Sequence, residues 1–162
     1  MPALSSKEAR SMSEKETGAM EIVKRNAIYS AGVGIFAIPV VNVAGVAALQ
    51  IKMLRELAAH YDVPFKQDRV KSIVTSLLGG IISTRLGYGL FAPISHLPLI
   101  GPLVGVATLP FFAGGATWAV GKVFIQHFAS GGTFLDFDPE KVRGYFSEQF
   151  GKAKSTAAAA TA

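Results

Sequence analysis

The 162-residue chain has no cysteine, which excludes disulfide bonds, thiolate chemistry and zinc sites built from cysteine. It also lacks an H-E-x-x-H motif, a catalytic-serine motif and a phosphate-binding loop. Its three histidines belong to no known metal-binding motif. We therefore expect a protein with no metal ion, no cofactor and no enzymatic activity.

Charged residues are scarce: they make up 17% of the chain, compared with about 25% in ordinary globular domains. The formal net charge is +5, but acidic and basic residues are interleaved along the chain. No basic cluster with interspersed aromatic residues appears, which argues against nucleic acid as a partner. The excess of positive charge instead favours weak attraction to anionic lipid headgroups.

Acidic residues are almost absent from the centre of the chain. Between residues 26 and 121 they are Glu56, Asp62 and Asp68. Residues 26–51 and 86–121 contain no charged residue at all, and long apolar runs of this kind are typical of membrane proteins. The length of the uncharged run 86–121 argues against a soluble helical protein. The absence of acidic residues from the apolar runs argues against an ion-coupled channel or transporter, which normally needs buried acids.

The first uncharged run, residues 26–51, could form a helix of roughly 39 Å, enough to span a bilayer core of roughly 30 Å. Pro39 and Asn42 lie at its centre, and a proline inside a helix removes a backbone donor and breaks or kinks the helix. The run is therefore either one kinked span or the two arms of a re-entrant hairpin.

The second apolar run extends over residues 72–121, with Arg85 as its one charged residue. A straight helix of this length would measure about 75 Å, too long for a single crossing. Pro93 and Pro98 break the run, which predicts two helices, the second over about 101–127. An arginine in such a run has three explanations: Arg85 lies at a membrane interface, it pairs with an acid, or it marks a functional position. We favour the interface.

Polar, amphipathic helices flank the apolar runs. Residues 52–63 have apolar side chains on one face, as in a half-buried helix. Gly131 is expected to end the helix before it in the left-handed conformation that glycine tolerates. Asp138 and Pro139 then form a helix start, since aspartate caps a helix N-terminus and proline suits its first position.

These patterns predict an all-α protein with membrane-embedded helical hairpins and a short amphipathic C-terminal helix. We divide the chain into a flexible tail at 1–17, a single helical membrane-associated domain at 18–152 and a low-complexity tail at 153–162.

Lysine and arginine flank both apolar runs on every side. Lys24 and Lys52 border the first run, and Lys71 and Lys122 border the second. Because basic residues near membrane segments stay in the cytoplasm, a single crossing would place one basic flank on the wrong side. Two hairpins that both enter from the cytoplasm satisfy the rule, with both termini cytoplasmic.

Two stretches resemble a known bacterial family of unknown function. Residues 37–63 contain an I-P-x-x-N break followed by L-Q-x-x-M-x-x-E-L-A-x-x-Y. Residues 112–150 contain G-x-x-F-x-x-H-F-x-x-G-G-T and a terminal D-P-E helix. These motifs are similar to those of the family that includes the YcjF-type inner-membrane proteins, whose domain stands alone or follows an Era-like GTPase domain. The resemblance implies a bacterial inner-membrane location and a GTPase partner, and it supplies no catalytic residues.

We therefore predict a non-enzymatic module, held in the lipid bilayer, that docks or positions a cytoplasmic partner such as a small GTPase. The candidate docking residues lie on the two amphipathic helices: Arg55, Tyr61, Tyr145, Phe146 and Phe150.

Small residues recur at four-residue spacing in the apolar runs, for example Ala44 with Ala48 and Gly101 with Gly105. Such rows let helices pack closely, either within one hairpin, which we favour, or between copies in a homo-oligomer. The alternative function is accordingly an oligomeric protein whose hairpins remodel membranes or form a pore.

Overall fold

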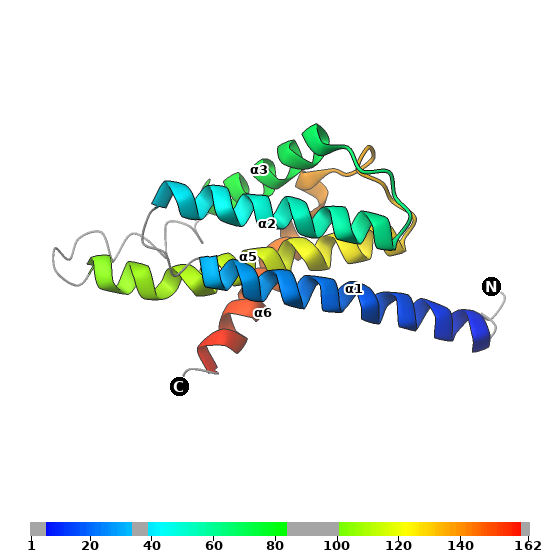
Figure 1. Ribbon diagram of the computed structural model, residues 1–162, viewed down its shortest axis with the longest axis horizontal. Coiled ribbons are helices and arrows are strands. Elements are labelled where there is room, and N and C mark those ends of the chain that lie inside the picture. Colours follow the sequence, from blue (N-terminus) through cyan, green and yellow to red (C-terminus); the bar gives the residue numbers. More distant parts are fainter. Residues whose placement is uncertain (1–5, 34–38, 84–100, 160–162) are drawn as a thin grey trace.

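The computed structural model describes residues 6–33, 39–83 and 101–159 and contains helices without strands in these ranges (Figure 1). The all-α prediction is therefore confirmed. The helices are α1 (Ser6–Val33), α2 (Pro39–His60), α3 (Gln67–Ser83), α5 (Gly101–Ala129) and α6 (Pro139–Ala159).

Helix α5 is the centre of the structure, because it contacts each of the other four helices. Helices α1 and α2 form an antiparallel hairpin against α5, and α3 covers α2 and α5 (Figure 1). Helix α6 crosses beneath this bundle obliquely and packs on α5 and α3. We refer to α1, α2, α3 and α5 as the bundle helices.

The first apolar run is divided between two helices. Helix α1 ends at Val33 and α2 begins at Pro39, so residues 26–51 do not form one kinked helix. Pro39 occupies the first position of α2, where its missing N–H costs no hydrogen bond. Asn42 lies within α2, so the break precedes it. Arg85, Pro93 and Pro98 lie outside the described residues.

Local capping chemistry sets several helix ends. Gly131 has φ 83°, and the amides of Gly131 and Gly132 donate to the carbonyls of Phe128 and His127 at 2.9 and 3.0 Å, which closes the last turn of α5. Asp62 ends α2 in the same way with φ 59°. The Asp138 carboxylate accepts a hydrogen bond of 3.0 Å from the amide of Glu140 and caps α6.

Both predicted tails include helix. Helix α1 begins at Ser6, inside the segment 1–17, and α6 continues to Ala159, inside the segment 153–162. The residues involved are mainly strong helix formers, such as alanine, lysine and glutamate, and Arg10 pairs with Glu14 one turn later at 3.1 Å.

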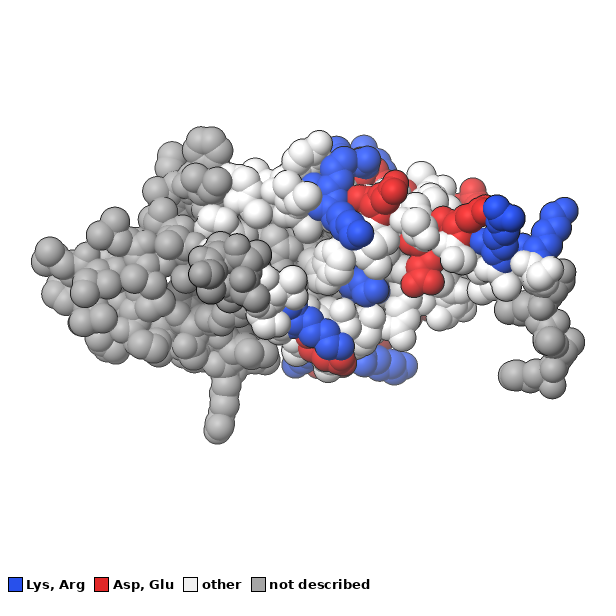
Figure 2. Space-filling view, turned by 90° about the horizontal axis from the view of Figure 1, so that it is seen from below, with Lys and Arg blue, Asp and Glu red and all other residues white. Residues whose placement is uncertain are grey.

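In each bundle helix the charged residues lie toward one end and an uncharged segment forms the rest. We call these two parts the charged half and the uncharged half of the helix, although they differ in length. The last charged residue of α1 is Arg25, the first of α2 is Lys52, the last of α3 is Lys71, and α5 contains Lys122 alone. Because successive bundle helices run in opposite directions, the uncharged halves lie at the same end of the bundle (Figure 1). Figure 2 shows charges of both signs among the coloured, described residues of the end that carries the N terminus.

None of the helices within the described ranges combines the length and the apolar character needed to cross a membrane.

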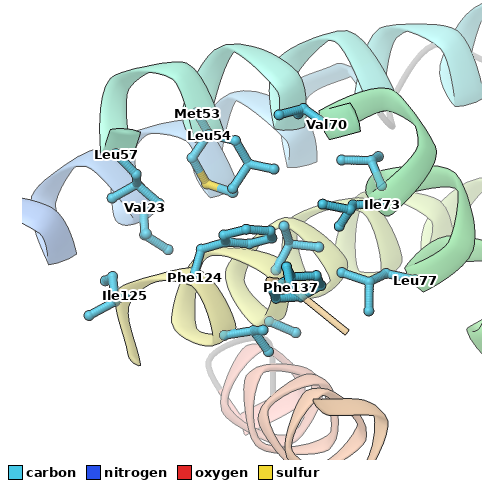
Figure 3. Close-up of a cluster of buried hydrophobic side chains, with 14 of the residues drawn as sticks. Val23, Met53, Leu54, Leu57, Val70, Ile73, Leu77, Phe124, Ile125 and Phe137 are labelled. Atoms are coloured by element: carbon cyan, nitrogen blue, oxygen red, sulfur yellow. The ribbon is translucent and has the colours of Figure 1, made fainter. Parts of the chain in front are cut away.

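The core is built around Phe124, which is 0% exposed (Figure 3). Its ring stacks on Phe137, with 4.5 Å between the ring centroids, and also contacts Phe128 and Phe134. Aliphatic side chains complete this core from α2 and α3: Met53, Leu54, Leu57, Val70 and Ile73.

Candidate functional site

Three polar side chains form a buried link among α1, α2 and α5. The amide nitrogen of Gln50 donates to the Thr117 hydroxyl at 3.3 Å, and that hydroxyl donates to the Ser30 hydroxyl at 2.9 Å. All three residues are 0% exposed and belong to the uncharged halves of their helices. The Gln50 Oε1 atom is buried and has no hydrogen-bond partner among the described residues. The link holds three helices together where no ion pair is available.

A cluster around Glu56 lies where the charged halves of α1 and α2 begin. The Glu56 carboxylate accepts hydrogen bonds from Lys52 at 2.7 Å, Arg25 at 2.9 Å and the buried Asn26 amide at 2.9 Å. Burial raises the pKa of Glu56, but the hydrogen bonds from these three residues lower it by more, so the net pKa is below the ordinary value of 4.5. The ionised carboxylate therefore ties α1 to α2.

We expect Glu56→Gln to make the protein less stable at neutral pH by about 1 kcal/mol. A carboxylate whose pKa is lower in the folded state adds stability above its unfolded pKa, and this stability disappears as pH falls through the folded pKa. The difference between wild type and Glu56→Gln should therefore shrink below pH 4.5. Denaturation of both proteins across pH measures it, with Glu21→Gln on exposed α1 surface as control. A difference that does not depend on pH would contradict this role of the charge.

The predicted docking residues occupy different environments. Arg55 is exposed, and its guanidinium carbon lies 4.8 Å from the centroid of the Phe65 ring. Tyr61 and Tyr145 are half-buried, and burial raises the pKa of each. Phe146 and Phe150 are each 2% exposed.

The burial of the two phenylalanines changes how they can be interpreted. The Phe150 ring lies edge-on to Phe112 of α5, with 5.3 Å between their centroids, and α6 contributes both rings to the core of this chain. Their spacing on one helix face predicts burial, but the sequence left open whether the partner is another helix of the chain or a second protein. The structure has them packed within the chain, so charged substitutions there would disrupt the fold instead of testing docking.

An apolar groove, which we call the α1–α5–α6 groove, opens on the molecular surface between those helices. Its cavity volume is about 600 Å³, and it has residues of all three helices along its walls. Gly114 and Gly115 of α5 line the groove and face α1 and α6, and neither adds a side chain to its wall. Trp118 and Lys122 of α5 also line it. No sequence pattern predicts this groove, although the two adjacent glycines and the single charged residue of α5 can be read in the sequence.

Within the described residues, no three His, Asp or Glu side chains lie together in a way that could hold a metal ion. His127 comes within 3.9 Å of Asp136, and its ring bonds to the Thr133 carbonyl at 2.8 Å. These contacts hold the turn after α5 closed.

The fold and these sites define a small helical-bundle protein with a lateral apolar groove and with one end at which the described helix residues carry no charge. The chain belongs to the family described as "Domain of unknown function (DUF697)", whose model matches residues 4–155. The family resemblance seen in the sequence is thus confirmed. A relative is "Magnetosome membrane protein 22" of Magnetospirillum gryphiswaldense, 30% identical over 141 residues that cover 86% of this chain and 72% of the relative. No solved structure matches the chain.

Proposed function

We propose that the chain is a non-enzymatic membrane module that docks or positions a cytoplasmic partner. The observation that carries the proposal is the segregation of charge: every bundle helix has its uncharged half at the same end. A bilayer is the environment that favours such an end, because apolar surface is stabilised there and charged residues are excluded. The name of the relative, a magnetosome membrane protein, supports the same environment.

The uncharged end enters the bilayer as helical hairpins. Within a helix the backbone groups are hydrogen-bonded internally, as the hydrocarbon region requires. The polar side chains of Ser30, Gln50 and Thr117 point to one another inside the bundle, so they are shielded from lipid. Basic residues at the border of the uncharged end, such as Lys52 and Lys122, suit the anionic headgroups of a bacterial inner membrane.

The charged end presents the surface for the partner. Its exposed residues include Arg55 of α2 and Leu135, which is 67% exposed in the turn between α5 and α6. The family resemblance implies a GTPase as the partner. Affinity isolation from detergent-solubilised membranes should recover a GTPase with the wild type and much less of it with Arg55→Ala plus Leu135→Ala. Equal recovery with both proteins would place docking elsewhere.

Membrane embedding is tested by extraction and by thiol labelling. We expect the protein to stay in the membrane pellet after high-salt and carbonate washes. The chain has no native cysteine, so single cysteines can replace Ala3, Gln67, Ser95 and Ser155. An impermeant thiol reagent outside intact cells should label none of these except Ser95→Cys, because both hairpins enter from the cytoplasm.

Two outcomes would contradict this arrangement. Release of the protein by carbonate would contradict the embedding of the hairpins in the membrane. External labelling of Gln67→Cys, or of Ala3→Cys without Ser155→Cys, would mean an odd number of crossings.

A further inference from the structure

The α1–α5–α6 groove has the chemistry of a binding site for one apolar chain. Its lining is mostly apolar, with small side chains at Ala27 and Ala31 of α1 and none at Gly114 and Gly115 of α5. Two large apolar residues of the lining are exposed: Ile28 at 70% and Phe111 at 37%. A cavity of about 600 Å³ is of the size that accepts a small-molecule ligand.

Two lysines line this groove, and Lys122 lies at one end of it. Lys122 is half-buried, and it forms no ion pair with any acidic residue that the structure describes. The other lysine of the lining, Lys152, is already paired with Glu148 at 2.5 Å. A partly buried lysine without a carboxylate partner among the described residues favours an anionic ligand group beside it.

We propose that the α1–α5–α6 groove binds an anionic phospholipid, with one acyl chain along the groove and the headgroup phosphate at Lys122. The proposal rests on the proposed membrane function, and it adds a lipid class and a position. Charge complementarity carries it, because the apolar groove ends at a lysine that has no ion pair among the described residues.

The direction of the groove agrees with this occupant. Along α5 the lining runs from Pro110 and Phe111, in the uncharged half, to Lys122, where the charged half begins. The acyl chain would therefore extend toward the uncharged end of the bundle, and the phosphate would lie at its border. This is the orientation of a lipid in a bilayer that surrounds the uncharged end.

The test uses the single tryptophan as its reporter. Trp118 lines the groove, so bromine atoms on a bound acyl chain will quench its fluorescence. The full-length chain in neutral detergent micelles is titrated with brominated phosphatidylglycerol, which is anionic, and with brominated phosphatidylcholine, which is zwitterionic. We expect the anionic lipid to bind about tenfold more tightly.

Variants assign the preference to the groove. Lys122→Ala should bind both lipids equally, Lys122→Arg should keep the preference, and Lys71→Ala, which removes an exposed lysine of α3, should match the wild type. Thr156→Phe, at an exposed position of the lining, should weaken quenching by both lipids. If Lys122→Ala does not fold, Lys122→Gln replaces it.

Equal binding of both lipids by the wild type, or a preference that persists without Lys122, would overturn the proposal. The micelle assay does not depend on membrane insertion. A carbonate-resistant protein without lipid preference would therefore refute the lipid site alone. A protein that is released by carbonate but keeps the preference would refute the embedded hairpins alone.

Discussion

Replacing Phe124 by alanine is expected to lower the free energy of unfolding by about 3–5 kcal/mol, the range for large-to-small changes of buried aromatic residues. Phe124 is 0% exposed and its ring contacts three other phenylalanines, including a stacked contact with Phe137 at 4.5 Å between centroids. The substitution would remove these contacts and leave a cavity at the point where α2, α3 and α5 meet (Figure 3). Denaturation of the purified protein, followed by circular dichroism, measures the loss.

The control is Leu135→Ala in the turn after α5. Leu135 is 67% exposed and removes little apolar area from water, so its substitution should change the free energy of unfolding by less than about 0.5 kcal/mol. Similar losses for Leu135→Ala and Phe124→Ala would show that the aromatic cluster is not the main core.

The second large effect is expected at Gly121, where α5 packs closely against Val23 of α1. A Cβ atom at this position would lie 3.0 Å from the Cβ of Val23 and closer still to both of its methyl groups. The branched side chain of Val23 cannot move away by rotation, because its methyl groups are attached next to the backbone. We expect Gly121→Ala to lower the free energy of unfolding by about 1–3 kcal/mol, the usual cost of overpacking.

The same substitution at Gly144 is the matched control. Gly144 lies inside α6 and is exposed, and nothing comes within 4 Å of an added Cβ. Alanine favours a helix over glycine, so Gly144→Ala should raise the free energy of unfolding by about 0.5–1 kcal/mol. Opposite signs at the two positions would show that close helix packing requires Gly121. A stabilising effect at both would contradict the close approach of α1 and α5.

Two glycines of α5 let this helix approach α1 closely. Gly114 faces Ala27 and Ala31 of α1, with an added Cβ 3.2 Å from the Ala27 carbonyl oxygen, and Gly121 faces Val23. Both positions therefore serve helix packing within the chain.

The sequence by itself determined the fold class and several helix boundaries. The second apolar helix was expected at about residues 101–127 and is observed at Gly101–Ala129, and α6 begins at the predicted Pro139. These boundaries depend on local chemistry: a capping aspartate, a glycine with positive φ and prolines at first helix positions. The alternation of uncharged and basic segments was also visible, because it depends only on the order of residues along the chain.

The tertiary structure decided which faces meet, because contacts between distant segments leave no local signal. Spacing along α6 showed that Phe146 and Phe150 share a face, and only packing against α5 showed that this face is inside. The link from Gln50 to Thr117 joins residues far apart in the chain. The groove likewise exists because three helices approach one another beside two glycines. Lys122 became informative only because no acidic residue in the described part of the chain pairs with it.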